Sequence, residues 1–171
     1  TNTKGNKYYL FLTKNNYNEN CCYFIDTKIV KGYELPRVIY THFRFKKQVF
    51  NDTLLEGELV KDYNNNWLFL LNEIYSFLGN SCSKLNKYKR IDKMFNLLKN
   101  YFIDDPYLNV CPIRIKKFFK KSDSEFMINE FIPKLKYPIN GLLFNNYFLN
   151  KINILFLFFF KKDFNLNYKS S

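Results

Sequence analysis

Two apolar segments joined by a short polar one constrain the fold of this chain more than any other feature. Residues 53–60 (TLLEGELV) and 67–75 (WLFLLNEIY) have the length and apolar content of strands, and the six residues between them, KDYNNN, form a polar turn. Segments so close in sequence are expected to pair as a hairpin with inward-facing apolar side chains. We therefore expect a sheet built around this hairpin.

The rest of the chain predicts further strands and one long helix. Between Lys87 and Phe102 the apolar residues recur at helical spacing, opposite a lysine-rich side. A short helix with Asp123 as its N-cap is expected over 123–132. This order predicts a single α+β domain over residues 1–171 with mostly antiparallel sheets. The further strands are expected at 7–12, 22–30, 38–45, 110–119, 139–144 and 152–160.

Composition excludes some classes of protein and leaves the partner open. Because 47% of the 171 residues are hydrophobic, wholesale disorder is excluded, and so is a collagen-like or disulfide-stapled fold. The net charge of +12 is typical of nucleic-acid binders. However, alanine is absent and four of the 27 basic residues are Arg, which indicates an AT-rich coding sequence. Part of the lysine excess then reflects codon composition.

The cysteine pattern is typical of a reducing compartment, and the apolar segments bear on secretion and membrane insertion. Cys21, Cys22, Cys82 and Cys111 form no CxxC spacing, and His42 is the single histidine. A zinc site and local Cys-His or Ser-His catalysis are therefore disfavoured, and buried free thiols are expected. The first apolar run is too short for a secretory signal, and residues 152–160 are too few to span a bilayer. We expect a cytoplasmic protein, neither secreted nor membrane-bound.

Two candidate sites lie within the central hairpin. Alternation along the strand places Glu56 and Glu58 on the same face, on either side of Gly57, where they could hold Mg²⁺ or a ribose. The alternative is an exposed strand edge with solvated acids. Glu73 lies inside a strongly apolar strand, so it should meet a cation or a hydrogen-bond donor, unless it simply faces outward.

Two further candidates lie near the ends of the chain. Asn140 and Gly141 form a tight polar turn before an apolar strand, which is either a ligand-binding turn or an ordinary Asn-Gly turn. Lys4 precedes Gly5, and Lys7 follows two residues later. Lys4 could act as a nucleophile if neighbouring cations lower its pKa. The alternative is a solvated loop lysine.

The order and spacing of these short segments along the chain resemble the motifs of the covalent nucleotidyltransferases. That family comprises the mRNA capping guanylyltransferases and the ATP- and NAD-dependent ligases. That family carries K-x-D-G-x-R, then D-G-E, a strand like YLIFDIL, D-G-L-I-F, and a K-x-K-like strand. TLLEGELV resembles the D-G-E strand, WLFLLNEIYSFLG the strand after it, and KRIDKMFNLL the following helix. IRIKKFF resembles the basic strand before the fourth motif, and FIPKLKYPINGLLF the approach to D-G-L-I-F. The closest likeness is to the capping branch of large DNA viruses.

The resemblance implies a nucleotidyltransferase core without the family's OB domain, and a function in mRNA capping. Lys4 would attack the α-phosphate of GTP and form a lysyl-GMP intermediate, with Mg²⁺ or Mn²⁺ as cofactor. The nucleotide would then pass to the RNA 5′ end. Other capping or transcription subunits would be partners, and the location would be the cytoplasm, a virus factory or the virion. Glu58 would bind metal or ribose; the other nucleotide-binding residues would be Lys7, Glu56, Glu73, Asn140, Lys161 and Lys162.

Departures from the family pattern leave two other functions open. Without a gap, Asn2 stands at the nucleophile and Lys4 at the acid of the first motif, whereas a two-residue deletion places Lys4 at the nucleophile. Glu56 and Asn140 replace family acids. One alternative is a catalytically degenerate relative that binds RNA, a cap or a partner subunit. The other is a basic RNA-binding or ribosome-associated protein, although its aromatic residues fall mostly in apolar strands where core packing is expected.

Overall fold

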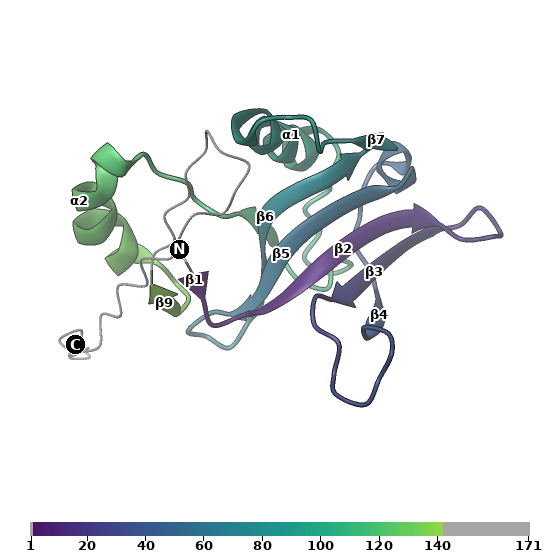
Figure 1. Ribbon diagram of the computed structural model, residues 1–171, viewed down its shortest axis with the longest axis horizontal. Coiled ribbons are helices and arrows are strands. Elements are labelled where there is room, and N and C mark those ends of the chain that lie inside the picture. The colour runs from purple at the N-terminus through teal and green to yellow at the C-terminus, as the bar shows by residue number, and fades with distance from the viewer. Residues whose placement is uncertain (1, 142–171) are drawn as a thin grey trace.

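A mixed seven-stranded sheet built around the expected hairpin dominates the structure (Figure 1). The structure is a computed structural model that describes residues 2–141. The strands of this sheet are β2 (Asn6–Lys14), β3 (Asn20–Asp26), β4 (Val38–Thr41), β5 (Thr53–Lys61), β6 (Trp67–Phe77), β7 (Asn80–Ser81) and β8 (Ile113–Ile115). Their order is β4-β3-β2-β5-β6-β7, with β8 beside β6. Thus β5 and β6 form the predicted hairpin, and β2 extends it on the β5 side.

A second, two-stranded sheet joins segments from the two ends of the described chain. Strands β1 (Asn2–Thr3) and β9 (Ile139–Gly141) pair antiparallel, and lie at the left end of the large sheet in Figure 1. The turns that precede β9 are a 3-10 turn (Lys121–Asp123), α2 (Ser124–Phe126), a π turn (Met127–Phe131) and another 3-10 turn (Ile132–Lys134). One further 3-10 turn, Lys47–Phe50, precedes β5.

The core lies between the large sheet and helix α1 (Lys87–Asn100). The helix begins where the Asn86 side chain accepts a hydrogen bond from the Lys89 backbone N–H, which is a regular N-cap. Met94 and Leu97 of α1 are fully buried against the sheet. Burial of apolar side chains is the main stabilising term for such a layered domain. The sheet contributes fully buried side chains from several strands: Leu10, Leu12, Leu55, Phe69, Leu71, Ile74 and Ile113.

Some expectations about the elements need correction. The sheet is mixed because β8 runs parallel to β6, so the expectation of mostly antiparallel sheets is too narrow. The strand expected at 22–30 ends at Asp26, before a loop in which Gly32 has a φ of 93°. The helix expected over 123–132 is a series of short turns, and Asp123 makes no capping hydrogen bond. Residues 142–144 and 152–160 lie outside the described residues.

Within residues 2–141, none of the helices combines the length and the hydropathy that a bilayer crossing requires.

The buried free thiols expected from the sequence are present. All four cysteines are free and buried, and burial raises the pKa values of Cys22 and Cys111 to about 11. At pH 8 only about one in a thousand such thiols is ionised. We expect a disulfide exchange reagent such as DTNB to modify none of the thiols in the folded protein within minutes, and all four in denaturant. Rapid reaction of a Cys22→Ser, Cys111→Ser variant would place the accessible thiol at Cys21 or Cys82.

Candidate functional site

The candidate site is centred on Glu58, a carboxylate that is buried in β5. Glu58 is 3% exposed, and its Oε1 lies 2.8 Å from Nζ of Lys116, which is 4% exposed. The Thr3 hydroxyl donates a hydrogen bond to the other oxygen, Oε2. Burial of one charge without a partner is costly, so the ammonium and the hydroxyl stabilise this carboxylate. Both carboxylate oxygens of Glu58 are therefore already bound in this arrangement.

The charges around Lys116 act on it in opposite directions. Burial lowers the pKa of Lys116 most, the positive charge of Lys7 lowers it further, and Glu58 opposes both by stabilising the ammonium. Lys7 is the cross-strand partner of Glu58, on β2, and is exposed. Burial raises the pKa of the Tyr137 hydroxyl, and the negative charge of the nearby Glu58 carboxylate raises it further. Glu58 thus lies among two lysines and a tyrosine.

The first residues of the chain are fixed to this site by backbone and side-chain contacts. Thr3 contacts Glu58 through its hydroxyl, and its carbonyl oxygen accepts a hydrogen bond of 3.3 Å from Nδ2 of Asn140. A Cβ atom on Gly5 would lie 2.4 Å from Cγ1 of Val60 and 2.6 Å from the Leu59 carbonyl oxygen. No other residue fits at Gly5 without moving β5, so this glycine fixes the position of the segment.

Two other predicted acids have partners of their own. Tyr75 donates a hydrogen bond of 2.5 Å to Glu56, and burial followed by this contact raises the pKa of the Tyr75 hydroxyl. Glu73 lies 2.8 Å from Nζ of Lys87 and 2.9 Å from Nε of Arg90, both on α1. The expectation that Glu73 meets a cation is confirmed. In this arrangement the carboxylate joins α1 to β6, and its role in nucleotide binding stays a prediction.

A wide cleft opens beside Lys116. Its volume is about 1440 Å³, which exceeds the usual size of a small-molecule pocket, so a nucleotide has ample room. The cleft is lined by residues of β6, β8, one side of α1, and the segment 131–137. Six of the side chains that line it are Lys or Arg and three are Asp, so its charge favours an anion. The basic lining residues are Lys99, Arg114, Lys116, Lys117, Lys134 and Lys136.

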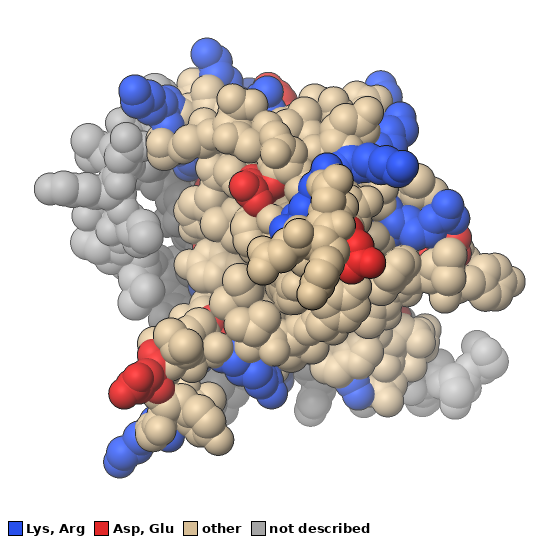
Figure 2. Space-filling view, turned by 90° about the vertical axis from the view of Figure 1, so that its right-hand side faces the viewer, with Lys and Arg blue, Asp and Glu red and all other residues tan. Residues whose placement is uncertain are grey.

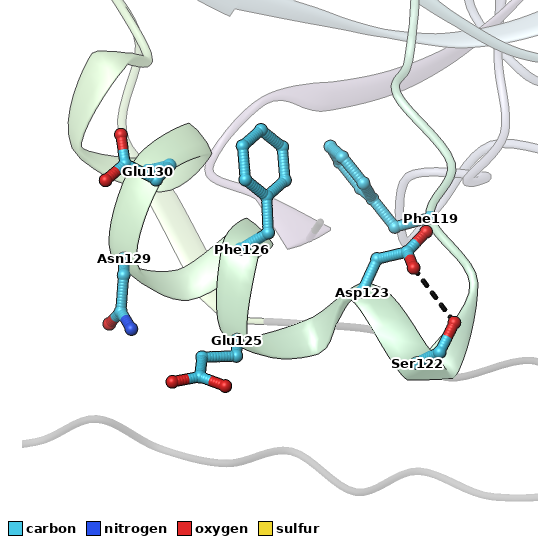
Figure 3. Close-up of a pocket in the computed structure, with 7 residues that line it drawn as sticks. All are labelled: Phe119, Ser122, Asp123, Glu125, Phe126, Asn129 and Glu130. Carbon is cyan, nitrogen blue, oxygen red and sulfur yellow. Dashed lines mark hydrogen bonds between the residues drawn. The ribbon is translucent and has the colours of Figure 1, made fainter.

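A second hollow lies in the segment of short turns and has a different character. In Figure 3 the rings of Phe119 and Phe126 project into the same space, with centroids 6.4 Å apart, whereas the Glu125 side chain points away. The Asp123 carboxylate is held by a hydrogen bond of 2.9 Å from Ser122. The remaining lining residues are Asn129 and Glu130. None of the predicted site residues lines this acidic hollow, so it is separate from the candidate site.

The basic residues are also spread over the outer surface. Figure 2 shows the face at the right-hand side of Figure 1, where Lys and Arg side chains project around much of the rim and a few acidic side chains lie nearer the middle. This distribution agrees with the net charge of +12. A surface of this kind attracts polyanions without specifying one.

The structure brings together only part of the predicted site. Glu58, Lys7 and Asn140 surround the Thr3 segment, and Lys4 is exposed next to it. Lys161 and Lys162 lie outside the described residues. Within residues 2–141, no group of three His, Cys, Asp or Glu side chains could hold a metal ion. Since Glu58 is also bound by Lys116 and Thr3, the described residues do not fit a metal held by the protein alone.

Sequence reasoning missed Lys116 and Thr3 as members of the site. Lys116 follows three residues of alternating strand, IRI, and alternation would have placed its side chain on the face opposite to Ile113 and Ile115. The pairing of β8 with β6, which brings this lysine to Glu58, has no local signal in the sequence. Nothing in the sequence indicated a role for Thr3 except its position two residues before Gly5.

Comparison with known families agrees with this arrangement. The family model of the mRNA capping enzyme catalytic domain matches residues 1–150, which include β1, β5, β6, α1 and β9. A search of curated proteins finds no match. The matched range covers most of the chain and includes every described residue of the candidate site. The chain therefore belongs to the family of mRNA capping enzyme catalytic domains.

Proposed function

We propose that this domain binds GTP in the basic cleft beside Lys116, together with the 5′ end of RNA, and that it forms no lysyl-GMP intermediate. The observation that carries the proposal is the packing of Gly5 against Val60 and the Leu59 carbonyl. Glycine is required there for steric reasons, as expected for the glycine of the family's K-x-D-G-x-R motif. Counting back three residues from Gly5, the position of the nucleophilic lysine is occupied by Asn2.

Asparagine at this position removes the covalent step. An amide nitrogen is not a nucleophile toward phosphorus, whereas a deprotonated lysine amine is. The other substitutions point the same way, because Asn140 replaces a family acid and the Glu58 carboxylate is bound by Lys116 and Thr3. The domain would then retain the nucleotide pocket of the family without its transfer chemistry.

The charge of the cleft supports binding of a triphosphate. Arg114, Lys117 and Lys136 lie among its lining residues, and charge-assisted hydrogen bonds from such groups to phosphate oxygens are strong. Mg²⁺ or Mn²⁺ would be bound mainly through the phosphates of the nucleotide, as is usual for these ions. Further capping or transcription subunits as partners, and a cytoplasmic, virus-factory or virion location, stay predictions.

Covalent guanylylation through Lys4 is the second candidate function, and the exposure of Lys4 beside the Thr3–Glu58 contact favours it. In that case the Lys4 amine, after losing a proton to water, would form an N–P bond to the α-phosphorus of GTP, and pyrophosphate would leave. The terminal phosphate oxygen of a 5′-diphosphate RNA would then attack the same phosphorus and release Lys4.

Labelling with [α-³²P]GTP in the presence of Mg²⁺ or Mn²⁺ distinguishes the two candidates. We expect no labelled band from the wild-type chain on a denaturing gel, although equilibrium dialysis detects GTP binding. We expect Asn2→Lys to gain a band at least about tenfold above background, because it restores an amine at the family position. The bond should be labile to acid and stable to alkali, as a phosphoramidate is.

The Lys4→Ala variant is the matched control. A wild-type band that disappears in Lys4→Ala would overturn the non-covalent proposal and establish Lys4 as the nucleophile. Absence of both label and GTP binding in a folded chain would remove the guanine nucleotide from the function altogether.

A further inference from the structure

We propose that a row of aromatic side chains on the open face of the large sheet binds single-stranded RNA by stacking, next to the candidate site. The row, called the aromatic row below, consists of Tyr9, Phe11, Tyr23, Tyr40 and Tyr75. The inference rests on the proposed function for the identity of the nucleic acid. It goes beyond that function by locating the RNA nucleotides that follow the 5′ end and by naming the side chains that would bind them.

The strand register places these rings beside one another. Tyr40 on β4 is the cross-strand partner of Tyr23 on β3, which is the partner of Phe11 on β2. Cross-strand partners share a face of the sheet. The rings of Tyr23 and Tyr40 have centroids 5.7 Å apart, and those of Tyr9 and Tyr75 are 5.9 Å apart. The five side chains therefore extend across strands β4, β3, β2 and β6.

This face is the one that points away from the hydrophobic core. Alternation along β2 turns Tyr8, Leu10 and Leu12 into the core, so Tyr9 and Phe11 face the other way. Tyr40 is 64% exposed and Tyr75 is 41% exposed, while the other three are partly buried. These aromatics are therefore available for contact, although the sequence pattern assigned the aromatic residues of the strands to core packing.

The aromatic row is continuous with the candidate site. Tyr9 is the cross-strand partner of Glu56, which accepts the hydrogen bond from Tyr75 and lies two residues from Glu58. Three strand spacings separate β4 from β5, or roughly 14 Å. At roughly 3.4 Å per stacked nucleotide, about four nucleotides would span that distance. An RNA whose 5′ end lies beside Glu58 would place its next few bases over the row.

RNA fits this face better than a protein partner does, for two reasons. Tyrosine and phenylalanine rings offer flat surfaces for bases, and stacking on them is tolerant of sequence. The end of the row that meets the candidate site carries the exposed Lys7, in a chain of net charge +12, which suits a phosphate backbone.

Fluorescence anisotropy with a 3′-labelled ten-nucleotide RNA carrying a 5′-diphosphate tests the inference. The double variant Tyr23→Leu, Tyr40→Leu should bind at least about tenfold more weakly than the wild type, because each base–ring stack contributes a factor of roughly 5 to 150. Tyr23→Phe, Tyr40→Phe keeps both rings and should bind within about threefold of the wild type. Tyr107→Leu changes a tyrosine that is 94% exposed in the loop after α1, away from the row, and should leave the RNA affinity unchanged.

Several outcomes would overturn the inference. One is equal affinity of the leucine variant and the wild type, and another is an equal loss in the phenylalanine variant. A third is sedimentation of the wild type as a dimer that the leucine variant dissociates, since this would make the face a protein interface. If the wild type binds GTP and the leucine variant binds RNA as tightly as the wild type, this inference is overturned and the proposed function stands. Loss of both GTP and RNA binding in a folded wild-type chain would overturn the proposed function as well.

Discussion

Replacement of Glu58 by alanine is expected to destabilise the domain by about 3–5 kcal/mol, the usual cost of leaving one member of a buried ion pair without its partner. Lys116, which is 4% exposed, would lose the carboxylate that lies 2.8 Å from its Nζ, and the Thr3 hydroxyl would lose its acceptor. Urea unfolding followed by tryptophan fluorescence measures the loss, because the single Trp67 lies in β6 beside β5. The midpoint should fall while the slope stays constant.

Two controls make this result specific to the buried pair. Glu130→Ala removes an exposed carboxylate that pairs with Lys134 one helical turn away, and should cost about 0.5 kcal/mol or less. The double variant Glu58→Gln, Lys116→Met removes both charges and keeps an acceptor for Thr3, so most of the stability should return. A loss in Glu58→Ala no larger than that in Glu130→Ala would show that the pair contributes little.

Replacement of Gly57 by alanine is expected to destabilise the domain by about 3 kcal/mol, at the upper end of the range for overpacking. An added Cβ would lie 2.6 Å from Cζ of Phe69 and 2.7 Å from the Leu70 carbonyl oxygen. Phe69 is fully buried against Phe24, with ring centroids 5.0 Å apart, so it has little freedom to move away. The glycine between the two acids is therefore a packing requirement of the hairpin.

Two further variants test this explanation. Gly32→Ala places a Cβ where nothing lies within 4 Å, so it causes no clash. Only the backbone strain of an alanine at a φ of 93° should destabilise this variant, by about 1 kcal/mol. Gly57→Ala combined with Phe69→Leu removes the ring contact and should be less destabilised than the sum of the two single variants. Simple additivity would indicate that the backbone contact to Leu70 dominates.

The sequence predicted those parts of the fold that depend on local pattern. The hairpin of β5 and β6 was visible in two apolar runs around a polar turn, and α1 in its helical period. The cationic partner of Glu73 followed from the cost of burying a lone acid. Each of these inferences needs only residues that are near in sequence or a rule about burial.

The parts that were missed depend on long-range pairing. The parallel pairing of β8 with β6 brings Lys116 to Glu58, and no local pattern encodes which strands will be neighbours. The aromatic row has the same origin, because the register of β2, β3 and β4 decides which rings share the open face. Two shifts of register between β5 and β6, next to Leu54 and Glu56, likewise had no signal in the sequence.

The pairing of β1 with β9 bears on the order in which the domain is assembled. Thr3 pairs with Ile139, so β1 is synthesised long before the segment with which it pairs. Contacts of such long sequence separation form late, since closing the loop is opposed by chain entropy. The large sheet and its core can fold beforehand from nearer neighbours. The candidate site would then be completed last, when β1 and β9 meet beside Glu58.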